Sequence, residues 1–194
     1  MSAAPPRITP LEPRQWPEEM REAMAALRPP LALHPVPERR DDRPKALNAL
    51  GTLARYPALA RAFNTFNGHI LYATTLSQRQ RELIVLRIAS LRRCDYEWAQ
   101  HRVLAAEAGL TEEEIDRVAH GPESPGWSAP ERTVLLAVDE LVGHATLSDE
   151  TWAALSSGLD ERQLMDLVFT VGAYEVLAMA FNSFAVELDD DLRK

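Results

Sequence analysis

Residues 76–121 decide the fold, and they read LSQRQRELIVLRIASLRRCDYEWAQHRVLAAEAGLTEEEIDRVAHG. A Ser-x-x-Gln capping box opens the segment and predicts a helix over 77–92. A second helix is expected over 95–108, where a glycine ends it. A Thr-x-x-Glu capping box then predicts a short helix over 111–121. Because short turns join these helices, they are expected to pack as neighbours.

Helical spacing continues on both sides of this segment. Apolar residues recur at intervals of three and four over 45–73, which is typical of amphipathic helices. Further helices are expected over 128–145 and after Ser148, and a last one over 160–188 with a break near Gly172. Since no stretch of useful length alternates apolar and polar residues, we predict an all-α fold.

The helical part contains a weak internal repeat. The segment LSQRQRELIV, which starts at Leu76, recurs as LDERQLMDLV, which starts at Leu159. The pair Tyr96-Glu97 is loosely matched by Tyr174-Glu175. We therefore predict a duplicated helical unit. Met179 stands at the place of a histidine in the first copy, so the chemistry is expected in the first copy alone.

The N-terminal residues have a different composition. Residues 1–44 hold ten of the 14 prolines. Proline removes a backbone donor and favours extended geometry before it. We therefore predict a proline-rich arm over 1–44 with one short helix near 17–27, followed by a helical domain over 45–194. Such an arm is expected to have little core of its own and to lie on its own domain or on a partner subunit.

Composition narrows the class of protein. The formal net charge of −8 disfavours nucleic acid and anionic membranes as partners. Cys94 is the single cysteine, so an intrachain disulfide and a zinc site with several thiolates are excluded. The N-terminus has no signal-like apolar region, and no apolar run approaches about 20 residues. We expect a cytoplasmic protein with no metal, and with no nucleotide cofactor because no glycine-rich phosphate loop is present.

Three residues whose side chains could take part in catalysis lie on one helix face. Glu97 follows Cys94 by three residues and His101 follows it by seven, so at about 100° per residue all three lie on one stripe. Glu82 lies on the preceding helix and can face this stripe. A thiol at a helix N-terminus beside Arg92 and Arg93 is expected to have a lowered pKa. Carboxyl and imidazole groups suit general acid and base work.

The same residues also fit a structural interpretation. A lone cysteine in a helical protein is often a small buried hydrophobe. Glu97 and His101 at helical spacing can form a solvated face with a modest pair interaction. Spacing alone leaves both interpretations open.

The order of these residues is similar to that of a known family. Glu82, eleven residues, Cys94, two residues, Glu97, three residues, His101 and then GLTEEEI resembles the carboxymuconolactone decarboxylase and alkylhydroperoxidase-D-like (AhpD-like) family. The resemblance implies an AhpD-like helical fold and catalytic roles for these four residues. It also implies homo-oligomers, from dimers through trimers to hexamers, with sites near subunit interfaces.

The chain combines features of two branches of that family. In the alkylhydroperoxidase branch the motif is a glutamate, a CxxC pair and a histidine four residues later. Glu97 stands at the second cysteine position, so an internal dithiol cycle is not available. The decarboxylase branch carries a tyrosine–glutamate pair before the histidine, as Tyr96 and Glu97 precede His101 here. Tyr96 and Trp98 are candidate substrate-binding residues.

Three functions follow from these features. The first is a lyase that decarboxylates a carboxylated lactone or related small acid by proton transfer through glutamate and histidine. The second is a single-cysteine hydroperoxide reductase, an antioxidant of peroxiredoxin type, in which Cys94 needs an external thiol reductant. The third is a non-catalytic helical assembly module. A metal held by Cys94, His101 and a glutamate is a minor variant.

Overall fold

A computed structural model describes residues 5–35 and 44–193 of the chain. All regular structure in these residues is helical, which confirms the all-α prediction. The contacts divide the described residues into two compact units: those within Met1–Thr74 and Met179–Lys194, and those within Thr75–Ala178. The boundary after residue 44 stays a sequence prediction, since the contacts divide the chain elsewhere.

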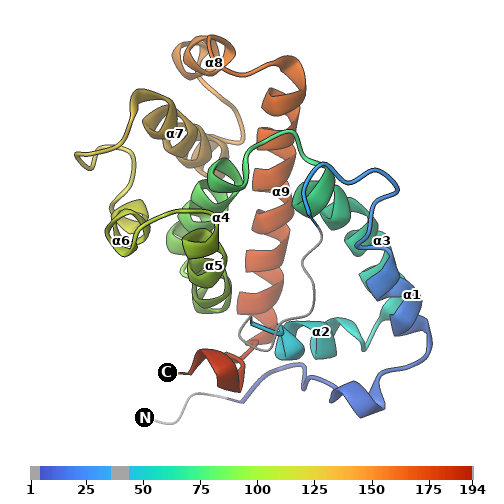
Figure 1. The fold of residues 1–194 in the computed structure, drawn as a ribbon. Helices are drawn as coiled ribbons and strands as arrows, with labels where there is room; N and C mark the ends of the chain where they lie inside the picture. The colour runs from blue at the N-terminus through green and yellow to red at the C-terminus, as the bar shows by residue number, and fades with distance from the viewer. Residues whose placement is uncertain (1–4, 36–43, 194) are drawn as a thin grey trace. The chain divides into compact units, whose positions relative to one another are not determined.

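The first unit contains the N-terminal residues and three α-helices. These are α1 (Glu19–Ala25), α2 (Leu47–Leu53) and α3 (Pro57–Gly68), followed by a π-helical turn η2 (His69–Ala73), with short 3₁₀ turns at η1 (Pro13–Gln15) and η3 (Asp190–Leu192) (Figure 1). Helix α1 confirms the short helix expected near 17–27.

The described residues of the N-terminal arm gain their burial from the helices that follow them, as expected for an arm that lies on its own domain. Met20 and Ala23 of α1 are fully buried against Ala54 and Ala60. The Trp16 indole packs on the same cluster and donates a hydrogen bond to the Leu11 carbonyl at 2.9 Å. Proline sets the turns of this segment, but apolar side chains between the prolines supply enough burial to anchor it.

The second unit is built around α4 (Gln78–Arg92). Helices α5 (Asp95–Glu107), α6 (Glu112–His120) and α7 (Ala129–His144) pack against α4, and α8 (Asp149–Ser156) packs against α7. Helix α9 (Glu161–Phe184) contributes its residues up to Ala178. Capping boxes at Ser77, Thr111 and Ser128 open α4, α6 and α7, as the sequence predicts.

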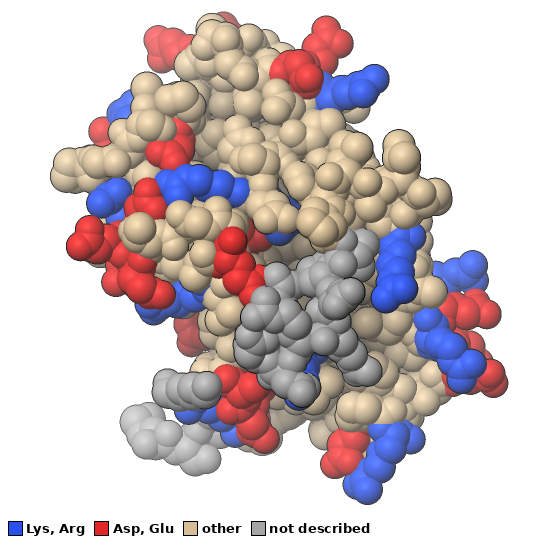
Figure 2. Space-filling model, in the orientation of Figure 1, with Lys and Arg blue, Asp and Glu red and all other residues tan. Residues whose placement is uncertain are grey.

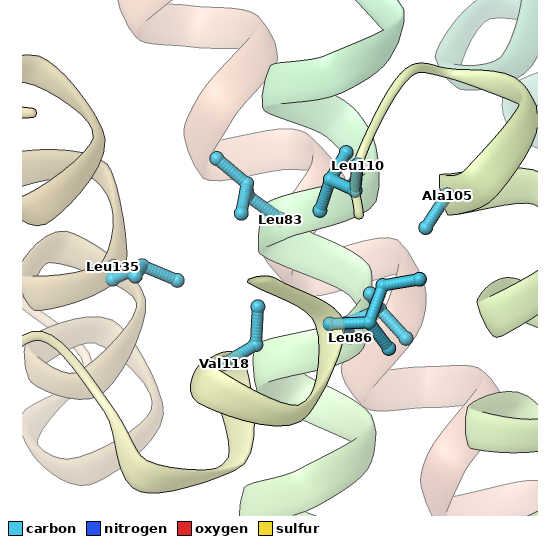
Figure 3. Packing of buried hydrophobic residues seen from close by; sticks show 7 residues of the cluster. Leu83, Leu86, Ala105, Leu110, Val118 and Leu135 are labelled. Carbon is cyan, nitrogen blue, oxygen red and sulfur yellow. The ribbon is translucent and has the colours of Figure 1, made fainter. Parts of the chain in front are cut away.

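Helix α4 is enclosed on all sides, because every residue from Arg81 to Ala89 is buried. Its apolar side chains join a core with residues of α5, α6, α7 and the turn between α5 and α6 (Figure 3), formed by Leu83, Leu86, Ala105, Leu110, Ile115, Val118 and Leu135. Polar groups on such a helix must be paired inside the protein. Arg87 meets this need with Asp139, at 2.6 and 2.9 Å, and with two carbonyls of α6.

Helix α9 differs from the sequence expectation in two ways. It runs without a break through Gly172, since neighbours such as Ala173 and Tyr174 are buried and hold it in place. A glycine in a helix costs about 1 kcal/mol relative to alanine, which such packing outweighs. The helix is also long and apolar enough to cross a membrane by composition, which corrects the expectation that no segment is. Half of that stretch is buried inside the protein, and core helices pass the same test.

Charged side chains of both signs are mixed on the surface over α6 (Figure 2). Arg102 pairs with Glu112 and lies 3.7 Å from Asp116, and all three side chains are well exposed. Exposed pairs of this kind contribute about 0–1 kcal/mol each. This surface therefore adds little to stability.

Candidate functional site

The turn between α4 and α5 places Cys94 at the start of α5. Arg93 adopts the left-handed conformation, with φ of 50°, and reverses the chain immediately after α4. The backbone N–H of Cys94 then donates to the Ala89 carbonyl at 2.9 Å. The turn is as short as the sequence predicts, and it makes α4 and α5 direct neighbours.

A buried carboxylate–imidazole pair links these two helices. The Glu82 side chain is fully buried in α4, and its Oε2 lies 2.7 Å from Nδ1 of His101 in α5. With Glu82 ionised, Nδ1–H of His101 is the donor. Within the described part of the chain, Nε2 of the imidazole makes no hydrogen bond.

Two residues to which the sequence assigned no role in the site, Arg81 and Tyr174, complete the pair. Arg81 donates from Nε and Nη2 to Oε1 of Glu82, at 3.0 and 2.8 Å. The Tyr174 ring of α9 meets the His101 imidazole edge to face, with centroids 5.1 Å apart. The carboxylate is therefore held by a guanidinium on one oxygen and an imidazole on the other, and the tyrosine restricts the imidazole ring.

These partners set the charge of Glu82. Burial alone raises the pKa of its carboxyl group, because the charged form loses its water. The charges and hydrogen bonds of His101 and Arg81 together outweigh burial, and the pKa ends below its ordinary value. Glu82 is thus an ionised acceptor at neutral pH.

Cys94 and Glu97 form a second pair, in which the pKa values are raised, whereas that of Glu82 is lowered. Burial and, after it, the neighbouring carboxyl group of Glu97 together raise the pKa of the Cys94 thiol to about 12. This reverses the expectation of an acidic thiol. The helix terminus is present, but the side chain is only 1% exposed and Arg92 is engaged elsewhere. The thiol is therefore protonated at neutral pH.

Glu97 is a buried carboxyl group with no formed hydrogen bond. Its side chain is 2% exposed, and neither oxygen has a hydrogen-bonding partner among the described residues. Its pKa is raised to about 8, chiefly by burial; the nearby Cys94 thiol lowers the pKa, and the Glu175 carboxylate raises it. Glu97 therefore carries a proton at neutral pH, whereas Glu82 does not.

The structure joins the four expected site residues as two pairs. Glu82 contacts His101, and Cys94 lies beside Glu97, but the described contacts do not join Cys94 to His101. Glu97 and His101 lie four residues apart in α5, so they share a face.

The two candidate substrate-binding residues are placed differently. Tyr96 is buried, and its hydroxyl accepts a hydrogen bond from the Gln100 amide at 3.3 Å. Trp98 packs against the α4–α6 core and borders a surface depression of about 480 Å³ with Arg93 and Asp95. Their role in binding substrate stays a prediction.

Acidic residues elsewhere in the second unit have other partners. Asp139 accepts from Arg87, and Glu140 accepts from the Ser148 backbone and side chain and from Thr151. Among residues 5–35 and 44–193, no three His, Cys, Asp or Glu side chains form a group that could hold a metal ion.

The raised pKa of Glu97 predicts a pH dependence of stability. The folded state keeps this proton up to about pH 8, whereas the unfolded chain releases it near pH 4.3, so the folded state binds more protons between these values. Stability should fall as pH rises through this window, by up to about 1.4 kcal/mol per pH unit. We expect Glu97→Gln to remove this slope in urea unfolding between pH 5 and 8. Equal slopes for the variant and the parent protein would contradict the buried, protonated state.

Comparisons with known proteins agree with the resemblance seen in the sequence. The family model described as "Carboxymuconolactone decarboxylase family" matches residues 57–140, which include Glu82, Cys94, Glu97 and His101. A comparison with curated proteins gives no match.

Solved structures share the fold at low sequence identity. A peroxidase-related protein from Ralstonia eutropha JMP134, described as an alkylhydroperoxidase AhpD core, has a TM-score of 0.67 and 20% identity over 84% of this chain and 95% of that one. A protein from Agrobacterium tumefaciens proposed to be the antioxidant defence protein AhpD has a TM-score of 0.66 and 20% identity, over 71% and 94%. The debrominase Bmp8, as a cysteine-to-alanine variant in complex with 2,3,4-tribromopyrrole, has a TM-score of 0.71 and 16% identity, over 100% and 95%. These similarities show an AhpD-like fold.

Proposed function

We propose that this member of the carboxymuconolactone decarboxylase family is an acid–base enzyme that decarboxylates a small carboxylated lactone or β-keto-like acid. The observation that carries the proposal is the buried contact of 2.7 Å between Glu82 and His101. In this proposal His101 transfers the proton to the substrate, Glu82 positions the imidazole, and Glu97 is the acid that supplies the proton.

The Glu82–His101 pair has the properties that a positioned base needs. An ionised carboxylate on Nδ1 fixes the tautomer of the imidazole and directs the lone pair of Nε2 away from the pair. Arg81 prevents rotation of the carboxylate by occupying its other oxygen. Such fixed geometry is what makes a side chain effective in proton transfer.

Glu97 supports the proposal by supplying the complementary acid. Its pKa of about 8 leaves it protonated at neutral pH but close enough to release the proton. It lies one turn before His101 on α5, so the two groups share a face of that helix. Two carboxyl groups whose pKa values are driven apart are a pattern typical of acid–base sites.

The reaction balances with these groups. The bond between the substrate ring carbon and its carboxylate breaks, and carbon dioxide leaves. The electron pair stays on the ring carbon and is delocalised into an adjacent carbonyl as an enolate. A proton passes from the acid group to that carbon through the imidazole, and solvent returns a proton to the enzyme. The fold also occurs in Bmp8, which was solved with a small brominated ring; this supports a small cyclic substrate.

A substrate panel in deuterium oxide tests the proposal. Carboxylated lactones and β-keto acids are incubated with the protein, and mass spectrometry follows carbon dioxide loss and deuterium at the vacated carbon. His101→Ala should lower the rate about 10²–10⁴-fold, the usual contribution of a general acid or base. Glu112→Gln, on an exposed pair, should leave it unchanged. Loss of activity in Cys94→Ser alone, with His101→Ala fully active, would refute the proposal.

A single-cysteine hydroperoxide reductase is the second candidate, because Cys94 lies beside Glu97, a carboxyl group that can exchange a proton with it. The thiol sulfur would attack the peroxide, giving a sulfenic acid and an alcohol, and an external thiol would reduce the enzyme. The raised thiol pKa weighs against it. Stoichiometric hydroperoxide followed by mass spectrometry decides: an unmodified Cys94 eliminates this function.

The homo-oligomer and the cytoplasmic location also remain proposals. Deletion of residues 1–44 is a poor test of assembly, because Met20 and Ala23 belong to the core of the first unit. Light scattering on the intact chain measures its mass directly. A non-catalytic assembly module predicts that Glu82, Cys94, Glu97 and His101 can be replaced with no loss of any activity found in the substrate panel.

A further inference from the structure

Arg92 ties the end of α4 to two other helices of the second unit. Its Nε lies 2.8 Å and 3.0 Å from the two carboxylate oxygens of Glu175 in α9, and its Nη2 lies 2.7 Å from one of them. The same Nη2 donates to the Val142 carbonyl near the end of α7, at 3.0 Å. A bidentate contact of this kind fixes both the position and the orientation of the Glu175 carboxylate relative to the guanidinium.

The partner of Arg92 sits next to the candidate site. Glu175 follows Tyr174 directly in α9, and the Tyr174 ring packs on the His101 imidazole. The Glu175 carboxylate also acts on Glu97 as a nearby like charge. This stretch of α9 therefore contacts the imidazole through Tyr174 and places the charge of Glu175 near Glu97. Both residues belong to the internal repeat seen in the sequence.

We propose that the Arg92–Glu175 ion pair is a positioning element of the site, which holds α9 over the imidazole and sets the charge that Glu97 experiences. Arg92 and Glu175 contact neither the imidazole nor the Glu82 carboxylate through a described hydrogen bond. Their action on the chemistry is thus indirect. As a refinement of acid–base catalysis the inference rests on the proposed function, but the electrostatic effect itself does not require turnover.

The pair makes predictions of opposite sign for its two members. The groups that act on Glu97 are the Cys94 thiol at the start of α5 and Glu175 on α9, whose charge Arg92 of α4 neutralises. Replacing Glu175 with glutamine removes a negative charge and makes ionisation of Glu97 easier. Replacing Arg92 with methionine keeps the aliphatic stem but leaves Glu175 unneutralised, which makes ionisation harder. Loosened packing alone would admit water in both variants and ease ionisation in both.

Carbon-detected NMR titration of the Glu97 side chain tests the inference on the full chain without substrate. Relative to the parent protein, the Glu97 pKa should fall in Glu175→Gln and rise in Arg92→Met. It should stay near the parent value in Arg92→Lys, which keeps the charge, and in Glu112→Gln, which removes an exposed carboxylate elsewhere. If Arg92→Met does not fold, an unchanged Glu97 pKa in Glu175→Gln still overturns the inference.

Shifts of the same sign in Glu175→Gln and Arg92→Met, or no shift in Glu175→Gln, would overturn the inference. The substrate panel has a separate readout. Opposite shifts with an inactive panel would leave the Arg92–Glu175 effect established and the decarboxylase proposal refuted. If the protein decarboxylates a substrate of the panel in a His101-dependent way but the Glu97 pKa does not shift, the decarboxylase proposal stands and the Arg92–Glu175 inference is refuted.

Discussion

Glu82→Ala is expected to lower the free energy of unfolding by about 3–5 kcal/mol, the usual cost of removing one partner from a buried ion pair. The change leaves the Arg81 guanidinium, 9% exposed, with its Glu82 contacts gone, and it also removes the acceptor of the His101 imidazole. A cavity in the middle of α4 adds to the loss. Urea unfolding at pH 7 measures the change.

Two variants calibrate this result. Glu82→Gln keeps the volume and one acceptor oxygen, so it should cost less than the alanine variant. Glu112→Ala breaks the Arg102 pair, in which the glutamate side chain is 69% exposed, and should cost about 0–1 kcal/mol. A cost for Glu82→Ala no larger than that for Glu112→Ala would show that Glu82 is not a buried, paired carboxylate.

Cys94 is expected to react with iodoacetamide at pH 7 about 10³-fold more slowly than an ordinary exposed cysteine. The thiolate is the reactive form, and a pKa of about 12 instead of about 8.5 lowers its fraction by at least that factor. Burial of the side chain slows access further. Mass spectrometry of alkylation, with the urea-unfolded chain as the fast reference, measures the ratio. Equal rates in the two states would contradict the buried, protonated thiol, and a faster rate in the folded state would indicate the acidic thiol that the sequence suggests.

Local sequence signals predicted the framework of the site well. The capping boxes at Ser77 and Thr111 and the glycine after α5 define where helices begin and end, because these residues satisfy backbone groups locally. The short turn before Cys94 then forces α4 and α5 together, which brings Glu82 to His101. Helical spacing also placed Glu97 and His101 on one face. All of these inferences use residues close together in the chain.

The parts that sequence reasoning missed depend on tertiary packing. Arg81 precedes Glu82 directly, and adjacent helix residues do not normally face each other, so the spacing gave no signal. Tyr174 and Glu175 arrive from α9, about 75 residues later than His101. The internal repeat pointed to them but not to their role. The acidity of Cys94 was misjudged because the helix terminus and the arginines are visible in sequence, whereas burial and the Arg92–Glu175 pair are not.

One helix pair, α4 and α5, holds two buried glutamates in opposite charge states: Glu82 is ionised against His101, and Glu97 is protonated beside Cys94. Infrared spectroscopy of the protein at pH 7 tests this claim most directly, because a protonated carboxyl group has a carbonyl band that a carboxylate lacks. We expect such a band in the parent protein and in Glu82→Gln, and its loss in Glu97→Gln. A parent spectrum without the band, or a band that disappears in Glu82→Gln instead, would contradict it.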